Sequence, residues 1–95
     1  MSDVIERLDA HIVGRVQGVG FRHFTTQQAR RLGVDGWVRN EPDGGVRVVA
    51  EGPRDVLEQF LERLREGPAG ARVQMIHQTW ETASGELAGF SARYF

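Results

Sequence analysis

The segment from residue 14 to residue 22 constrains the fold of this 95-residue chain more than any other stretch. It reads Gly-Arg-Val-Gln-Gly-Val-Gly-Phe-Arg, with three glycines in its first seven positions and Arg22 at its end. Glycine adopts backbone conformations that a Cβ forbids, and it leaves neighbouring N–H groups uncovered, so several can point at one anion. The planar guanidinium of Arg22 matches a phosphate or a carboxylate. Because no side chain of the segment can attack covalently, the pattern predicts an anion-binding turn without a nucleophile.

A glycine-rich connection is also often a plain tight turn, and the glycines alone leave that alternative open. The segment matches neither a dinucleotide fingerprint, whose third glycine is missing, nor a P-loop, whose Gly-Lys-Ser/Thr ending is absent. Charge favours anion binding, because no Asp or Glu falls between Ala10 and Val34. The same stretch holds four arginines: Arg15, Arg22, Arg30 and Arg31.

Hydrophobic periodicity places the segment between a strand and a helix. Apolar residues alternate over residues 7–13, and helical spacing over residues 21–32 ends at Gly33. The further predicted elements are strands over residues 34–40 and 46–51, a helix that Pro53 opens, a strand over residues 72–81 and a short one over residues 90–94. The order β-α-β-β-α-β predicts a ferredoxin-like α+β sandwich, with an antiparallel sheet and two helices on one face. The segment then lies at the N-terminus of the first helix, whose dipole favours an anion.

Composition narrows the classes of function. The formal charge of −1 at pH 7 argues against a general nucleic-acid binder. The absence of cysteine excludes disulfides, thiolate catalysis and thiolate metal sites. The start of the chain has no apolar signal region and no apolar run reaches membrane length, so we expect a cytoplasmic protein without a membrane partner. Since no repeat, linker or low-complexity stretch interrupts the chain, residues 1–95 are predicted to form a single domain.

Two blocks of the sequence resemble the acylphosphatase family. The first is the segment of residues 14–22, and the second is Gly36-Trp37-Val38-Arg39-Asn40. Further matches, which extend the resemblance over about residues 7–94, are Thr25, Ala29, Leu32-Gly33, Asp43-Gly44, Val46, Glu51-Gly52 and Phe90-Ser91-Ala92-Arg93-Tyr94. Two positions depart from the family pattern: Glu41, where vertebrate members carry threonine, and Phe95, which extends past the usual terminal tyrosine.

The resemblance implies a small free-standing hydrolase that cleaves the carboxyl–phosphate bond of acyl phosphates without a metal or other cofactor. It implies that Arg22 binds the phosphate and that Asn40 positions the attacking water. The phosphate oxygens would be held by the loop amides of Val16, Gln17, Gly18, Val19, Gly20 and Phe21. The chemistry agrees, because an acyl phosphate has a good leaving group, so positioning and electrostatic stabilisation suffice. The histidines at positions 11 and 77 have no ligand spacing, so a metal site is not expected.

Several residues also have structural explanations that the sequence leaves open. Asn40 precedes a Pro-Asp-Gly turn and can simply start it. His23, in the first predicted helical turn, can touch substrate, although a solvated histidine is commoner there. Thr25 either supports the loop through its hydroxyl or faces the sheet. Trp37 and Trp80 are expected to pack rather than to stack on a ligand.

Two other classes of function stay open at this point. One is a noncatalytic phosphate-binding or anion-binding module on the same fold, which binds phosphate without turnover. The other is an RNA-binding sheet domain, which needs aromatic side chains on its central strands and a basic face. Residues 46–51 contain no aromatic side chain, so RNA binding ranks last. We therefore expect a small-molecule acyl phosphate as the partner and no nucleic acid, and, since no self-complementary apolar patch stands out, a monomer.

Overall fold

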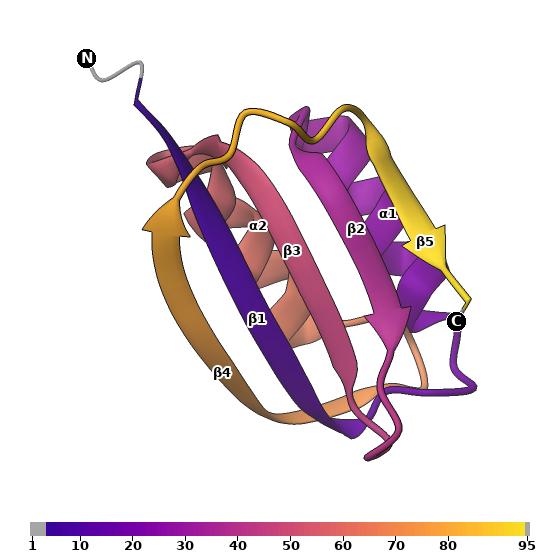
Figure 1. Ribbon diagram of the computed structural model, residues 1–95. Coiled ribbons are helices and arrows are strands. Elements are labelled where there is room, and N and C mark those ends of the chain that lie inside the picture. Colours follow the sequence, from indigo (N-terminus) through magenta and orange to yellow (C-terminus); the bar gives the residue numbers. More distant parts are fainter. Residues whose placement is uncertain (1–3, 95) are drawn as a thin grey trace.

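The computed structural model describes residues 4–94, which form five strands and two helices (Figure 1). In chain order these are β1 (Ile5–Arg15), α1 (Phe21–Leu32), β2 (Asp35–Asn40), β3 (Val46–Pro53), α2 (Arg54–Glu66), β4 (Arg72–Thr82) and β5 (Phe90–Arg93). All the predicted elements are present, with ends that differ by one or two residues. The departure that Phe95 makes from the family pattern lies outside the described residues.

The strands lie side by side in the order β4-β1-β3-β2-β5 (Figure 1). The pairs β1–β3, β1–β4 and β2–β3 are antiparallel, which confirms the predicted ferredoxin-like core. The pair β2–β5 is parallel, so the complete sheet is mixed rather than antiparallel throughout. The reason is the connection after β4, which crosses from one edge of the sheet to the other and brings β5 in alongside β2 in the same direction (Figure 1).

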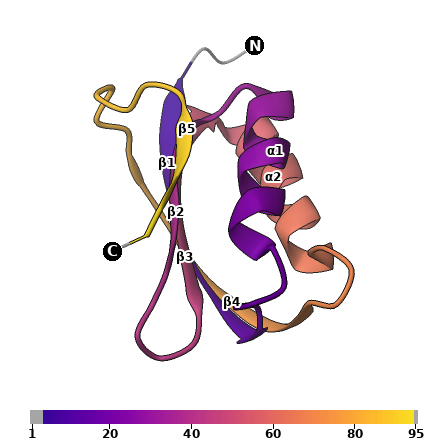
Figure 2. The same cartoon turned by 90° about the vertical axis from the view of Figure 1, so that its right-hand side faces the viewer.

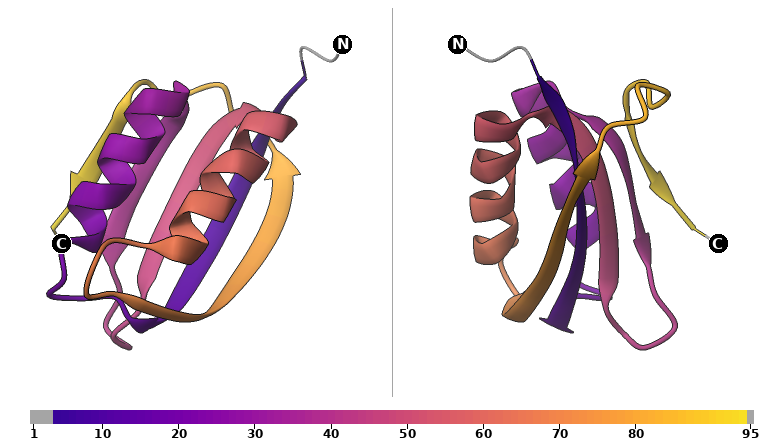
Figure 3. Two further views of the ribbon diagram at one scale, coloured as in Figure 1. Left: turned by 180° about the vertical axis from the view of Figure 1, so that it is seen from behind. Right: turned by 60° about the vertical axis from the view of Figure 1, so that its left-hand side comes forward.

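Both helices cover the same face of the sheet, as predicted (Figures 2 and 3). Strand alternation puts Leu8, Ala10 and Ile12 of β1 on that face, and all three are fully buried. The apolar stripe of α2 packs against them through Leu57, Phe60, Leu61 and Leu64. Full burial of side chains of this size contributes about 1.5–3 kcal/mol each to the hydrophobic free energy of folding. Neither helix is long and apolar enough to cross a membrane, within residues 4–94.

The two tryptophans lie on opposite faces of the sheet, and both pack against arginines, as expected of structural residues. Trp37 lies on the face away from the helices, whereas Trp80 lies opposite Leu8 on the face that the helices cover. Trp37 is only 8% exposed, and the guanidinium of Arg93 lies 4.5 Å from the centre of one of its rings. Trp80 is half-buried and has Arg54 at 3.7 Å. These distances suit cation–π contacts, which stabilise packing without a ligand.

The connection from β4 to β5 is fastened by the buried carboxylate of Glu51. It accepts the N–H and hydroxyl of Ser84 at 2.8 and 3.0 Å and the N–H of Gly85 at 3.0 Å, and Arg7 Nε lies 3.6 Å away. Burial by itself raises the pKa of Glu51, but these donors and Arg7 outweigh it, so the pKa lies below its ordinary value. Glu51 therefore holds the connection that leads β5 to its place beside β2.

Candidate active site

The loop between β1 and α1, residues 16–20, is called here the glycine loop. Gly18 and Gly20 have φ angles of +74° and +77°, which other residues rarely adopt, although a Cβ at either position would meet no atom within 4 Å. Glycine is therefore required at these two positions by the backbone conformation and not by a lack of space for a side chain. Val16 is 1% exposed and anchors the start of the loop in the core. Among the described residues, no acceptor is found for the backbone N–H groups from Gln17 to Gly20.

Helix α1 starts directly after the glycine loop with its N-terminus uncapped. The residue before it, Gly20, has no side chain to bind the first N–H groups, and the first turn contains no acidic residue. The first N–H groups of a helix lack intrahelical acceptors and carry the positive end of its dipole, so they attract an anion. Phe21, which is 2% exposed, fixes this end in the core. The hydroxyl of buried Thr25 donates to the Phe21 carbonyl at 2.8 Å, so it stabilises the first turn.

The guanidinium of Arg22 is held by the end of β5. Its Nη1 donates to the Arg93 carbonyl at 3.3 Å, and its Cζ lies 3.9 Å from the centre of the Tyr94 ring. In the described part of the chain no carboxylate forms an ion pair with Arg22. The side chain is thus oriented by a carbonyl and an aromatic ring, while its charge stays available for a bound anion.

Asn40 is the last residue of β2 and lies opposite Val46 in β3. Its half-buried side chain forms no hydrogen bond with any residue between 4 and 94. The turn that follows is instead closed by a side-chain bond from Asp43, whose Oδ1 accepts the Gly45 N–H at 2.8 Å. That N–H lowers the pKa of the Asp43 carboxyl. The turn is therefore stabilised without the Asn40 amide, which has no hydrogen-bond partner in residues 4–94.

These parts meet at a hollow of about 150 Å³, called here the loop hollow. Its lining consists of Val16, Gly18, Gly20, Phe21, Arg22, His23, Asn40 and Tyr94. The two predicted catalytic residues are thus brought together with four of the predicted loop residues. Gln17 and Val19, also predicted to bind phosphate through their amides, do not belong to this lining.

Sequence reasoning assigned no site role to Tyr94 and treated His23 as solvated. His23 is exposed, as expected, but it also lines the loop hollow. Tyr94 reaches the hollow because β5 pairs with β2 so that Arg93 lies opposite Arg39, which puts the next residues, Tyr94 and Asn40, at the same end of the two strands. The only signal in the sequence was its place in the closing block of the family resemblance.

Glu41, which departs from the family pattern, keeps its charge away from the loop hollow. Its Oε2 lies 3.3 Å from Arg39 Nε, and the residue does not line the hollow. Glu41 follows the last residue of β2, and its contact with Arg39 holds the carboxylate beside that guanidinium. No residue of the described part of the chain therefore brings a carboxylate into the lining of the loop hollow.

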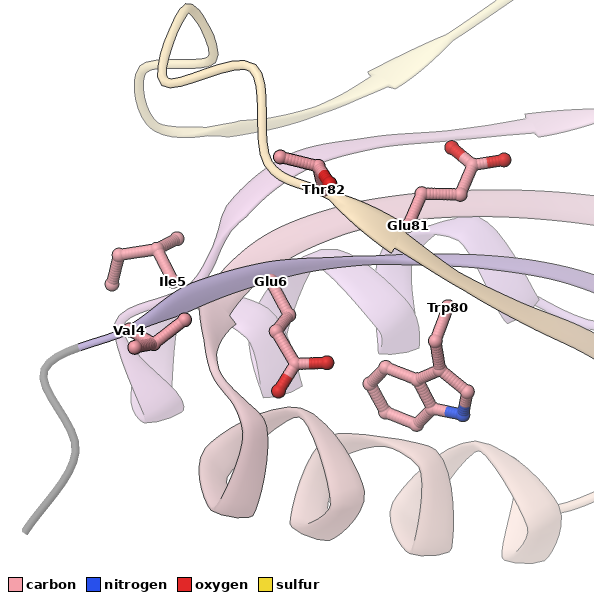
Figure 4. Close-up of a pocket in the computed structure, with 6 residues that line it drawn as sticks. All are labelled: Val4, Ile5, Glu6, Trp80, Glu81 and Thr82. Atoms are coloured by element: carbon pink, nitrogen blue, oxygen red, sulfur yellow. The ribbon is translucent and has the colours of Figure 1, made fainter.

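A second hollow, of about 390 Å³, lies at the opposite end of β1 (Figure 4). Val4, Ile5, Glu6, Trp80, Glu81 and Thr82 line it. Figure 4 shows Glu6 and Trp80 on the helix side of the strands and Glu81 on the other side. Two carboxylates and no arginine in the lining make it a poor site for an anion. Elsewhere in residues 4–94, no group of three or more His, Cys, Asp or Glu side chains could hold a metal ion.

Fold and loop hollow define the class of this protein as a ferredoxin-like α+β sandwich with a glycine loop, an arginine and an asparagine gathered at one site. Comparison with known proteins then narrows the class. A family model described as Acylphosphatase matches residues 8–92. The chain therefore belongs to the acylphosphatase family, as its resemblance predicted.

Individual relatives agree over nearly the whole chain. The acylphosphatase of Salinibacter ruber is 54% identical over 88 residues, which cover 93% of each protein. The acylphosphatase of Nocardia farcinica is 49% identical over 87 residues, which cover 92% of this chain and 87% of that one. The crystal structure of acylphosphatase from Bacillus subtilis superposes with a TM-score of 0.91 at 36% identity, over 94% of this chain and 99% of that chain. The predicted fold class is confirmed by this likeness.

Proposed function

We propose the following roles in the hydrolysis of acyl phosphates, the reaction that membership of the acylphosphatase family gives this chain. The N–H groups from Val16 to Phe21 and the Arg22 guanidinium hold the phosphoryl oxygens, and Asn40 orients the attacking water. The water oxygen bonds to phosphorus while the bond from phosphorus to the acyl oxygen breaks, and the carboxylate leaves with the electron pair. A phosphoryl oxygen takes the proton of the water, and the products are a carboxylate and inorganic phosphate.

The observation that supports these roles is the shared loop hollow. A helix start supplies Arg22, a strand end supplies Asn40, and the glycine loop lies between them. The hollow of about 150 Å³ is several times the roughly 30 Å³ that one water occupies in the liquid, so it has room for a phosphoryl group and a water. Donors fixed in place before the reaction stabilise developing charge without having to reorganise.

The chemistry of the lining fits a phosphoryl transfer in which positioning does most of the work. Among residues 4–94, no carboxylate in the lining repels the incoming anion, and the Arg22 charge, which has no carboxylate partner there, attracts it. The side-chain amide of Asn40 offers both donors and an acceptor, so it can orient a water. Because a carboxylate leaves readily, the site needs neither a covalent nucleophile nor a strong acid for the leaving group.

Release of inorganic phosphate from a synthetic aryl acyl phosphate tests this proposal. We expect rapid hydrolysis of that substrate and little hydrolysis of an ordinary phosphomonoester with the same aryl group, because the poorer leaving group needs an acid that the site lacks. Comparable turnover of the two compounds would contradict the assignment to acyl phosphates.

A noncatalytic anion-binding module on the same scaffold is the alternative function. The same sample distinguishes it, because titration with inorganic phosphate measures binding independently of turnover. Phosphate binding together with no hydrolysis of the aryl acyl phosphate would favour the binding module over the enzyme.

We also expect the activity to be independent of metal ions. The oxyanion charge is met in this proposal by backbone N–H groups and by Arg22. The chain has no cysteine, and no described residue of the lining supplies a carboxylate to hold a cation. Phosphate release should therefore be unchanged after dialysis against EDTA, and added magnesium or zinc should not increase it. Loss of activity on chelation that one particular metal restores would refute this part of the mechanism.

In this proposal the chain acts as a monomeric cytoplasmic enzyme of one domain, residues 1–95, on a small diffusible substrate. The oligomeric state and the location stay predictions.

A further inference from the structure

The side chain of Gln17 joins the glycine loop to the hairpin turn after Asn40. Its Nε2 donates to the Glu41 carbonyl at 2.8 Å and to the Gly45 carbonyl at 2.8 Å, across 24 and 28 positions of sequence. Both hydrogens of the amide are used, since an amide nitrogen has two to donate. The turn closes on itself at the same place, because the Glu41 N–H also donates to the Gly45 carbonyl at 2.8 Å.

This side chain does not belong to the lining of the loop hollow, although residues on both sides of it do. Val16 and Gly18 line the hollow, while the amide of Gln17 is turned to the hairpin. The backbone and the side chain of Gln17 therefore have different roles. Its backbone belongs to the loop that we propose for phosphate, and its side chain bonds to the segment that carries Asn40.

The two hydrogen bonds fix the distance between the two halves of the site. Asn40 is joined directly to Glu41, whose carbonyl Gln17 binds, so movement of the hairpin carries Asn40 with it. No other side-chain hydrogen bond joins the glycine loop to the turn within the described residues. A displacement of about 1 Å between reacting groups can lower a rate by as much as about 10²-fold.

We infer that Gln17 is a positioning residue: its side-chain amide holds Asn40, through the hairpin turn, at the right distance from the phosphoryl group. This inference rests on the proposed function, because it needs Asn40 to orient the water. The inference predicts different effects on the binding of phosphate and on the turnover of an acyl phosphate. Phosphate contacts the loop, which keeps its own glycines and helix start, whereas the attacking water depends on the hairpin.

The test is a Gln17→Met variant, which keeps the length of the side chain and removes its donors. We expect kcat to fall by about tenfold to 10²-fold while the affinity for inorganic phosphate changes by less than about threefold. The matched control is Gln28→Met. Gln28 is a buried glutamine that, like the half-buried Gln17, joins two elements: its Oε1 accepts a hydrogen bond from Arg63 Nη1 at 2.7 Å. It does not belong to the described lining of the loop hollow. The control should keep its kcat.

A double-mutant cycle with Asn40→Ala shows whether Gln17 acts through Asn40. In the Asn40→Ala background, we expect Gln17→Met to change kcat by less than about threefold, because the group that it positions is already absent. An equal loss in both backgrounds would overturn the inference, and so would a loss of phosphate affinity that parallels the loss of kcat.

If Gln17→Met does not fold, a second substitution tests the positioning role of Gln17. Gln17→Lys retains N–H donors that can reach both carbonyls, and we expect it to fold and to keep more of the parent kcat than any variant without donors. A folded Gln17→Lys with kcat lower than that of Gln17→Ala would contradict the inference.

If Asn40→Ala itself keeps normal turnover, the proposed role of Asn40 fails and this inference with it. If Asn40→Ala loses turnover and folded Gln17→Met keeps it, this inference alone fails.

Discussion

Arg22→Ala should lose both the binding of inorganic phosphate and the turnover of an acyl phosphate. The substitution removes the arginine that lines the loop hollow and that has no carboxylate partner among residues 4–94. Loss of a single oxyanion donor typically lowers kcat by about 10²–10³-fold, and a charged, bidentate donor contributes more than a neutral one. Because the guanidinium contacts the phosphoryl oxygens before and during the reaction, phosphate affinity and kcat/KM should fall together.

Arg30→Ala is the matched control for this substitution. Arg30 lies on the same helix and also donates to a carbonyl of β5, through Nη2 to Phe90 at 3.1 Å, but it does not line the loop hollow. Both variants thus lose an arginine that joins α1 to β5, but only Arg22→Ala removes a positive charge from the loop hollow. Equal losses of activity in the two variants, or an Arg22→Ala protein that binds phosphate normally, would show that Arg22 serves the structure alone. Thermal unfolding of both variants reports the structural part directly.

Local pattern was enough to predict the parts of the site that come from one stretch of chain. The glycines and Arg22 are adjacent in sequence, and helical spacing after them places the loop at a helix start. The φ angles of Gly18 and Gly20 are of the kind that glycine alone adopts readily, so composition and conformation agree. The same holds for the stripe of α2, because its period of about 3.6 residues determines which face is buried.

Contacts that depend on strand pairing could not be predicted in this way. Tyr94 meets Arg22 only because β5 joins the sheet beside β2, and the Arg22 bond to Arg93 spans 71 positions of sequence. A short terminal strand has no periodicity that gives its direction, so its parallel pairing was not foreseen. The target of the Gln17 side chain is equally non-local, since it depends on how the hairpin turn folds against the glycine loop.

Asn40 has two interpretations that the sequence leaves open, and the hydrogen bonds of the described residues favour the role in the site. A turn-starting asparagine binds the backbone of its own turn, and a site asparagine keeps its amide free. Here the turn is closed by Asp43 and joined to the glycine loop by Gln17, while the Asn40 amide has no partner among residues 4–94. The side chain lies instead in the lining of the loop hollow.

Asn40→Ala should therefore show a pattern different from that of Arg22→Ala. We expect inorganic phosphate to bind with nearly unchanged affinity, because the phosphoryl donors stay in place. We expect kcat to fall steeply, by about 10²-fold or more, since an interaction made mainly in the transition state affects kcat and kcat/KM equally. The thermal midpoint should stay close to that of the parent, because no hydrogen bond within the described structure is lost.

Asp43→Ala should show the opposite pattern to Asn40→Ala, with a larger effect on the thermal midpoint and a smaller effect on kcat. It removes the side-chain acceptor of the Gly45 N–H and leaves the lining of the loop hollow intact, so it should lower the thermal midpoint more than Asn40→Ala does. It should also lower kcat much less than Asn40→Ala, because the Gln17 bonds still hold the hairpin near the loop. Phosphate affinity, kcat and thermal midpoint measured on the same sample of each variant separate the two roles. An Asn40→Ala protein that unfolds early and yet turns over normally would mean that the amide stabilises the hairpin and that the attacking water is oriented by another group.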